Sequence, residues 1–89
     1  MGLEEDFLAA VEKVNNFKKK PSDDDLLIVY GLYKQATVGD VNTSRPGLFD
    51  PKGKAKWDAW KKNEGKSKDL AKQEYITKAT QLAEDCSTA

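Results

Sequence analysis

Hydrophobic residues recur along this chain at intervals of three and four, a spacing that places them on one face of an α-helix. Apolar positions at 3, 7, 10, 11, 14 and 17 predict a first helix over residues 4–16. A stripe near the end of the chain comprises Ala71, Tyr75, Ile76, Ala79, Leu82, Ala83 and Cys86. No segment shows the apolar–polar alternation between turn residues that is typical of a strand. The pattern therefore predicts an all-α protein.

Polar and turn-forming residues mark the limits of a second helix. Ser22 is a suitable N-cap, and Asp25 three residues later completes a pair that resembles a capping box. The helix runs to about Thr37, and Gly39 suits a left-handed C-cap.

Two further start signals predict the remaining helices. Asp50 and Pro51 supply the N-cap and first residue of a helix over residues 51–63, and Ser67 caps the last helix. Residues 39–50 form a long connection between the second and third helices. Four helices joined in this way predict a small bundle. The long connection allows the third helix to run in the same direction as the second, but periodicity does not decide this.

Length and charge limit the class of protein. The chain has 89 residues, the size of one small domain, so we expect residues 1–89 to form a single unit. Its 15 basic and 15 acidic side chains cancel, which argues against a protein held to nucleic acid or anionic lipid by bulk charge. The charge is nevertheless uneven. Residues 52–62 hold five lysines and one aspartate, whereas residues 4–12 hold four acids and no base.

The cysteine content and the apolar runs bear on location. The single cysteine, Cys86, excludes an intrachain disulfide and fits a reducing compartment. The N-terminus lacks the basic and apolar segments of a signal peptide. The longest apolar run, residues 26–33, is far too short to span a bilayer. We therefore expect a cytoplasmic monomer that is not an integral membrane protein.

Catalysis is the function class that the composition favours least. The chain has no histidine, so it lacks an imidazole acid, base or metal ligand. Cys86 has no base beside it in the sequence, and no glycine-rich phosphate-binding loop is present. We expect no catalytic residue, no metal and no cofactor.

The second helix carries a tyrosine–lysine face that consists of Leu27, Tyr30, Gly31 and Lys34, which are three and four residues apart. Two interpretations of this face are open. It can be a half-buried helix contact whose tyrosine hydroxyl and lysine head reach water. It can instead be an anion site in which Lys34 supplies charge, Tyr30 a neutral donor and nearby Tyr33 a π-face.

The third helix mixes lysines with tryptophans. Lys52, Lys56 and Trp60 share a face at four-residue spacing, and Trp57 and Trp60 are expected to anchor the helix in the core. The lysines can form a solvated face or contact phosphate as point charges. No stacking platform or groove-reading motif for nucleic acid is evident, so we expect no nucleic-acid partner.

Two further features allow both a structural and a functional interpretation. Tyr75 lies on the apolar stripe of the last helix, where a tyrosine is usually a core residue with a solvated hydroxyl. Lys18, Lys19 and Lys20 are most simply a solvated turn, and they can also border an anion site. The residues alone thus indicate a small helical bundle with a tyrosine–lysine face.

Three parts of the chain, in this order, resemble the acyl-CoA-binding protein family, also called diazepam-binding inhibitor. They are PSDDDLLIVYGLYKQATVGDVN at residues 21–42, RPGLFDPKGKAKWDAW at residues 45–60, and Tyr75 in the last helix. The resemblance covers nearly the full chain. It implies a four-helix bundle of up-down-down-up topology and one-to-one binding of long-chain acyl-CoA thioesters.

The same resemblance implies roles for individual residues. Those implied to bind CoA are Tyr30, Lys34 and Lys56 at the ribose 3′-phosphate, Tyr75 at the nucleotide, and Tyr33 and Leu27 beside the adenine. The acyl chain would lie in a groove partly walled by the first helix, with the candidates Phe7, Ala10, Val11 and Val14. Asn15 stands where many members carry a basic residue, and Lys18 is the expected substitute.

These expectations describe a non-catalytic protein that buffers medium- to long-chain acyl-CoA thioesters, transports them inside the cell and hands them to enzymes. Removal of acyl methylenes from water would contribute most of the gross affinity, at about 0.8 kcal/mol each. The alternative is a small helical protein-interaction module that holds a partner helix in an apolar groove. Such a groove would not need Lys34 and Lys56 together with Tyr30.

Overall fold

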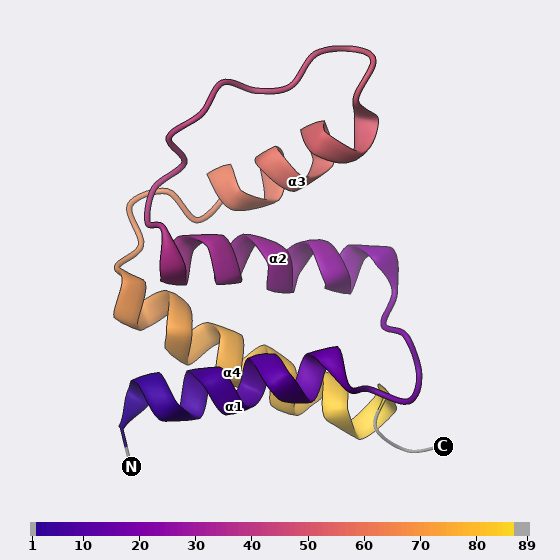
Figure 1. The fold of residues 1–89 in the computed structure, drawn as a ribbon, viewed down its shortest axis with the longest axis vertical. Coiled ribbons are helices and arrows are strands. Elements are labelled where there is room, and N and C mark those ends of the chain that lie inside the picture. Colours follow the sequence, from indigo (N-terminus) through magenta and orange to yellow (C-terminus); the bar gives the residue numbers. More distant parts are fainter. Residues whose placement is uncertain (1, 87–89) are drawn as a thin grey trace.

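A computed structural model describes residues 2–86, which contain four α-helices and no strand (Figure 1). The helices are α1 (Leu3–Asn15), α2 (Asp23–Thr37), α3 (Pro51–Lys61) and α4 (Lys68–Cys86). The predicted all-α class is confirmed. α3 is shorter than the predicted 51–63, because turns follow Lys61 and lead to Gly65, whose φ is +88°. None of the described helices has both the length and the apolar composition needed to cross a bilayer.

The last three helices begin where the sequence places a capping side chain. In each, a side-chain oxygen accepts a hydrogen bond from the backbone N–H three residues later. The pairs are Ser22 with Asp25 (3.2 Å), Asp50 with Gly53 (3.0 Å) and Ser67 with Leu70 (3.0 Å). These bonds satisfy donors that the first turn of a helix leaves unpaired, so the predicted starts are confirmed at atomic level.

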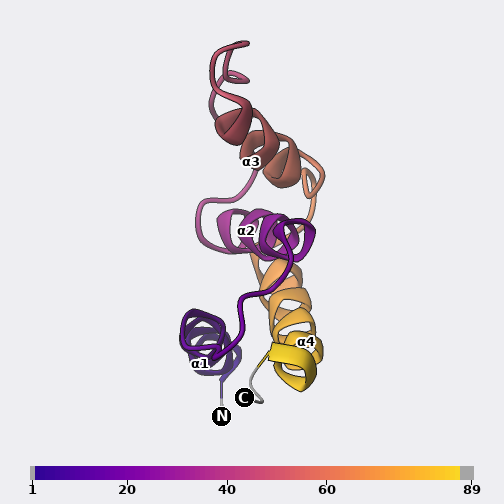
Figure 2. The same cartoon turned by 90° about the vertical axis from the view of Figure 1, so that its right-hand side faces the viewer.

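The helices run in the up-down-down-up order that the family resemblance implies. α1 and α4 run in one direction, and α2 and α3 in the other (Figure 1). α2 contacts α3 on one side and α4 on the other, while α1 packs on α4 (Figure 2). The connection between α2 and α3 returns the chain to the end where α2 began. As a result, α3 lies at one end of the 37 Å long axis and α1 at the other.

The apolar core lies between α1, α2 and α4. Its buried members are Phe7, Ala10, Val29, Leu32, Ala36, Ala71, Tyr75, Ala79 and Leu82. Within the described residues, α3 contributes none of them. Of the two tryptophans expected to anchor α3 in the core, Trp60 is buried, although it lies outside this cluster, whereas the expectation is wrong for Trp57. Trp57 is half-buried, and its Nε1–H donates to the carbonyl oxygen of Thr43 in the connection before α3 at 2.9 Å.

α3 is attached to α2 by a close backbone approach and by polar contacts. A side chain at Gly31 would clash with the carbonyl oxygen of Ala59, so glycine allows the two helices to come this close. The Trp60 Nε1–H donates to the carbonyl oxygen of Gly39 at 2.7 Å. Gly39 has a φ of +99°, as its predicted place after the end of α2 requires.

Gln35, buried on α2, fastens the connections before and after α3. Its Nε2 donates to Asp40 Oδ1 at 2.8 Å and to the carbonyl oxygen of Lys66 at 2.7 Å. Asp40 Oδ1 also accepts from the backbone N–H of Gly65 at 2.9 Å. The Gly65 bond first, and then the Gln35 bond, hold the pKa of the Asp40 carboxyl below its ordinary value. Both connections are therefore joined at one point of α2.

Candidate functional site

The tyrosine–lysine face of α2 lies against α3 at the crossing of the two helices. Lys56 Nζ of α3 lies over the Tyr30 ring, 5.5 Å from its centroid, and Lys34 Nζ lies over the Trp60 ring at 4.8 Å. Both distances are in the range of cation–π attraction. The two pairs are one turn apart on each helix, as expected for helices that run in the same direction. The crossing therefore positions two ammonium groups and a phenol in neighbouring places.

A cavity of about 570 Å³ lies beside Tyr30. Its lining combines three lysines and an aspartate with apolar and aromatic side chains, namely Lys20, Lys52, Lys56, Asp23, Leu26, Leu27, Tyr30, Pro51 and Ala55. We call it the lysine cavity. Its excess of positive charge suits an anionic group, and its apolar side chains suit an organic one. Of the predicted CoA residues, it brings together Leu27, Tyr30 and Lys56.

Of the residues that line this cavity, the sequence analysis offered Lys52 and Lys20 only as one of two interpretations, as contacts for phosphate or another anion, and it did not name Leu26. Leu26 lies four residues before Tyr30, so helical spacing carried a signal that could have found it. Lys20 lies in the connection between α1 and α2. No spacing rule indicates which lysine of that connection lines a cavity, so only the folded chain identifies it.

Asn15 and Lys18 lie apart from the lysine cavity. Asn15 is the exposed last residue of α1, and Lys18 is exposed in the connection that follows. Neither lines the cavity, whereas Lys20 does. The proposed substitution of Lys18 for the basic residue missing at position 15 stays a prediction.

Three aromatic rings meet where α1, α2 and α4 converge. The Phe7 ring centroid lies 6.1 Å from that of Tyr33 and 5.2 Å from that of Tyr75, and the two tyrosine rings are 6.4 Å apart. Phe7 and Tyr75 are buried, while Tyr33 is 40% exposed. Burial raises the pKa of the Tyr75 hydroxyl to about 12, so this hydroxyl stays protonated at neutral pH. The buried rings thus support an exposed ring face at Tyr33.

A second cavity, of about 350 Å³, lies beside these rings on the α1 side. Its lining includes Phe7 and Val11, two of the four residues predicted to wall an acyl-chain groove. The other two belong to the core region: Ala10 is buried in it and Val14 packs against it. The structure therefore places a cavity at part of the predicted groove, with Glu4, Lys68 and Lys72 beside its apolar side chains. The groove itself stays a prediction.

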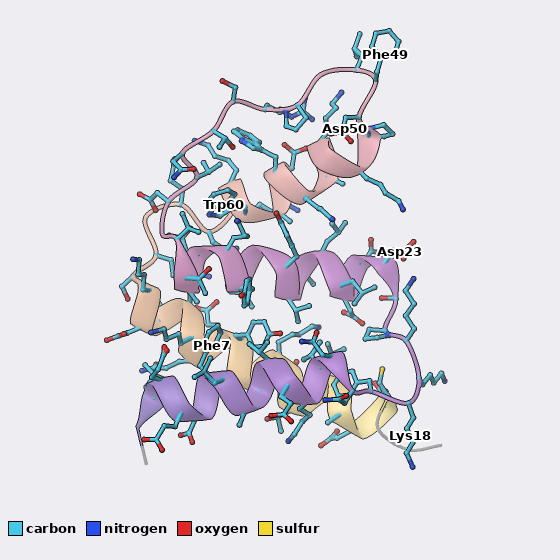
Figure 3. The ribbon with its side chains drawn as sticks, viewed as in Figure 1. Phe7, Lys18, Asp23, Phe49, Asp50 and Trp60 are labelled. Carbon is cyan, nitrogen blue, oxygen red and sulfur yellow. The ribbon has the colours of Figure 1, made fainter. Side chains whose placement is uncertain are left out.

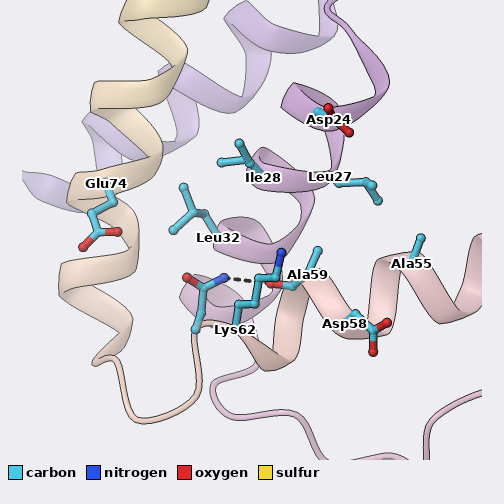
Figure 4. Close-up of a pocket in the computed structure, with 10 residues that line it drawn as sticks. Asp24, Leu27, Ile28, Leu32, Ala55, Asp58, Ala59, Lys62 and Glu74 are labelled. Carbon is cyan, nitrogen blue, oxygen red and sulfur yellow. Dashed lines mark hydrogen bonds between the residues drawn. The ribbon is translucent and has the colours of Figure 1, made fainter.

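A third cavity, of about 470 Å³, lies at the same crossing (Figure 4). Its apolar walls come from α2 and α3 and comprise Leu27, Ile28, Leu32, Ala55 and Ala59. Leu27 and Ala55 also line the lysine cavity, so the two cavities share part of their walls. Asp58, which lines the third cavity, accepts two 2.9 Å hydrogen bonds from Arg45, and these bonds lower the pKa of its carboxyl.

The side chains at the crossing favour one kind of ligand chemistry. Lysine ammonium groups and tyrosine hydroxyls donate hydrogen bonds that phosphate oxygens accept, and bonds assisted by charge are stronger than neutral ones. The exposed Tyr33 ring can stack on a planar group, and the nearby cavities offer apolar walls. The arrangement can therefore hold a phosphorylated ligand that also has aromatic and apolar parts.

Comparison with known proteins identifies the family. A family model described as Acyl CoA binding protein matches residues 4–79. The chain belongs to this family. An acyl-CoA-binding protein of Brassica napus is 63% identical over 84 residues, which cover 94% of this chain and 91% of that protein. The acyl-CoA-binding domain-containing protein 3 of Oryza sativa subsp. japonica is 61% identical over 85 residues, but this chain spans only 55% of its length.

Solved structures of acyl-CoA-binding proteins share the fold. The crystal structure of Oryza sativa acyl-CoA-binding protein 2 superposes with a TM-score of 0.89 at 54% identity, covering 94% of this chain and 93% of that one. The crystal structure of the acyl-CoA-binding protein from Moniliophthora perniciosa superposes with a TM-score of 0.88 at 48% identity. The match covers 99% of this chain and 86% of that one. The predicted four-helix fold of the acyl-CoA-binding type is thereby confirmed.

Proposed function

We propose that residues 1–89 form a single acyl-CoA-binding domain that binds, buffers and transports medium- to long-chain acyl-CoA thioesters without changing them. Membership of the acyl-CoA-binding protein family supports this ligand and does not favour the alternative of a protein-interaction module. The observation that carries the proposal is the α2–α3 crossing. Tyr30 and Lys56 share a lysine-rich cavity there, and Lys34 stands one turn further along.

The phosphates of CoA would bind at this crossing. Tyr30, Lys34 and Lys56 would hold the ribose 3′-phosphate, because they combine one neutral donor with two ammonium groups that neighbouring rings already position. Lys20 and Lys52 add charge in the same cavity. This surplus of donors matches a ligand that carries both a 3′-phosphate and a pyrophosphate.

The nucleotide would lie between this crossing and α1. The exposed Tyr33 ring and Leu27 would border the adenine, and Tyr75 would contribute a hydroxyl that keeps its proton. Asn15 would replace a charged contact by a neutral one, with Lys18 close enough in sequence to supply a cation.

The acyl chain would occupy a groove beside α1, formed by Phe7, Ala10, Val11 and Val14. Fourteen methylenes moved out of water give roughly 11 kcal/mol as an upper bound. The ordering of a flexible chain and the loss of free translation offset much of this. We expect affinity to rise with chain length until the groove is full, and equal affinity for octanoyl-CoA and palmitoyl-CoA would contradict a buried chain.

The cellular part of the proposal follows from this non-covalent chemistry. A cytoplasmic monomer would sequester the thioester and release it intact to acyl-CoA-using enzymes. Neither a metal nor a cofactor has a part in these steps, and no residue is assigned a catalytic role. Hydrolysis of palmitoyl-CoA during prolonged incubation with the pure protein would contradict this part.

Calorimetric titration tests the site. Palmitoyl-CoA should bind one to one, and free CoA and palmitate should each bind far more weakly. Lys34→Ala and Lys56→Ala should each lower the affinity for palmitoyl-CoA by roughly 10- to 100-fold, the range for loss of a hydrogen bond to a charged group. Lys61→Ala is the matched control, because Lys61 is an exposed lysine of α3 that pairs with Glu64 instead. Palmitate binding as tight as palmitoyl-CoA, or unchanged affinity in Lys34→Ala, would refute the proposed site.

A further inference from the structure

A groove lies between α3 and α4, over the middle of α2. It consists of the third cavity and a fourth of about 290 Å³, which adjoin because Ile28, Leu32 and Glu74 line both. The fourth cavity is completed by three residues of α4, namely Thr77, Lys78 and Gln81. Figure 4 shows Ile28 and Leu32 in the space between the two flanking helices. We call this feature the α3–α4 groove.

The floor of this groove is apolar and partly open to solvent. Ile28 is 46% exposed, although it is a large aliphatic side chain. Leu70, which is 44% exposed, precedes Glu74 by four residues and therefore lies on the same strip of α4 as that lining residue. The described helices thus leave an apolar surface uncovered between two helices, which is the setting in which an amphipathic helix of another protein packs.

Two opposite charges mark the ends of the groove. Asp24 lies in the first turn of α2, and Lys62 is the C-cap of α3. Since α2 and α3 run in the same direction, these residues lie at opposite ends of the third cavity, with Ile28 and Leu32 between them (Figure 4). Within the described residues, neither forms an ion pair. The other charged lining residues do, namely Asp58 with Arg45, Glu74 with Lys66 and Lys78 with Asp25.

We propose that the α3–α4 groove docks an amphipathic helix of a partner protein, which runs antiparallel to α2. Its apolar stripe would pack on Ile28 and Leu32, a basic residue would pair with Asp24, and an acidic residue would pair with Lys62. The direction follows from helix electrostatics, because acidic residues favour the first turn of a helix and basic residues the last. The acidic start of the docked helix would therefore lie at Lys62 and its basic end at Asp24.

The same charges argue against two other occupants. An anionic amphiphile suits the lysine cavity, where three lysines face one aspartate, better than a groove in which one unpaired acid balances one unpaired base. A second copy of this chain would offer α1, which has acids in its first turn and Lys13 in its last. Among the described large hydrophobic residues, however, α1 exposes Leu8 alone, and one side chain does not make a stripe.

Docking would accompany acyl-CoA binding and would be coupled to it. Leu27 and Ala55 line both the groove and the lysine cavity. A helix in the groove and a ligand in the cavity would therefore contact the same two side chains, and each would change the affinity of the other by the same factor. This consequence rests on the proposed function, whereas docking by the ligand-free protein does not.

Amide chemical shifts of the ligand-free full chain, recorded during titration with a designed helical peptide, test the proposal. The peptide carries a leucine stripe, glutamates in its first turn and lysines in its last. It should shift the amides that line the groove, and a nitroxide at its C-terminus should broaden the first turn of α2 most. Ile28→Ser should lower the peptide affinity about tenfold or more, and Asp24→Asn about two- to fivefold.

Phe49→Ser is the matched control and should leave the peptide affinity unchanged. Phe49 is also an exposed apolar residue, but it lines neither cavity of the groove and projects beyond α3 at the far end of the molecule (Figure 3). Titration of Ile28→Ser with palmitoyl-CoA separates this proposal from the proposed function. Unchanged palmitoyl-CoA affinity would show that the fold and the ligand site are intact, so that lost peptide affinity is due to the groove.

Four outcomes would overturn docking. They are no binding of the peptide, shifts centred outside the groove, equal peptide affinity of the wild type and Ile28→Ser, or a concentration-dependent dimer that Ile28→Ser loses. The last would assign the groove to a second copy of the chain. Loss of palmitoyl-CoA affinity in Ile28→Ser would instead assign the groove to the ligand, and strongest broadening near Lys62 would refute the antiparallel direction.

Discussion

The two ends of this molecule are held together by different interactions. At the α1–α4 end, buried apolar side chains from three helices form the core, including Phe7, Tyr75 and Leu82. α3, at the other end, adds no residue to that core among those described. It is attached through the close approach at Gly31, the Trp60 hydrogen bond and the contacts around Gln35. The proposed CoA site spans the junction between these two ends.

This contrast indicates how stability is distributed. Regions with few buried apolar contacts open locally at a lower free energy than the whole domain. We therefore expect α3 to open more readily than the core. Because Lys56 comes from α3 while Tyr30 and Lys34 come from α2, a ligand that bridges them should stabilise the α3 end most, by mass action.

The largest expected effect concerns the apolar core at the α1–α4 end. Leu82 is buried and lies outside the proposed site, so Leu82→Ala should lower the free energy of unfolding by about 2–5 kcal/mol. Urea denaturation measures this loss, and palmitoyl-CoA affinity at low temperature should not change. Gln81→Ala, at an exposed neighbour, should stay within about 0.5 kcal/mol of wild type. If Leu82→Ala also lost affinity for palmitoyl-CoA, the core and the proposed site would not be independent of each other.

Gly31→Ala tests the junction and should have an intermediate effect. The added methyl group must push α3 away from α2, which should lower the free energy of unfolding by about 1–3 kcal/mol. The higher helix propensity of alanine should offset about 1 kcal/mol of this loss. Hydrogen exchange should quicken in α3 more than in α1 or α4, and palmitoyl-CoA should bind less tightly. Gly47→Ala, where an added Cβ meets open space, is the control. Uniform acceleration across all helices would show that α3 belongs to one cooperative core.

The smallest expected effect concerns pH and the contacts near Gln35. The folded state holds the pKa of Asp40 below its ordinary value of 3.8. Its stabilising contribution is therefore complete above that value and lost as the pH falls through the lower, folded pKa. Asp40→Ala should lower the free energy of unfolding at pH 7. The difference in this free energy between the variant and the wild type should become smaller as the pH falls into the acid range. Asp40→Asn keeps an oxygen acceptor without a charge, so its free energy of unfolding at pH 7 should lie between those of the wild type and Asp40→Ala. A constant difference across the acid range would exclude a role for the carboxylate charge.

Local signals predicted the helices well because their causes are local. The caps at Ser22, Asp50 and Ser67 are hydrogen bonds over three residues, and each was predicted from residue type and spacing. The end of α3 was predicted two residues too late, since apolar periodicity does not register the turns that lead to Gly65. Trp57 was misplaced for a similar reason: its partner, Thr43, lies in a connection whose path no periodicity describes.

The sequence by itself determined the class of fold, the positions of the helices and the resemblance to the acyl-CoA-binding protein family. Only the tertiary structure decided which side chains meet. It placed Lys20, and not Lys18, in the lysine cavity, and explained Gly31 by the carbonyl oxygen of Ala59. It also showed that the apolar residues Leu48 and Phe49 stand in solvent. These outcomes depend on how helices cross and connections turn in space, which the spacing of residues along one helix does not specify.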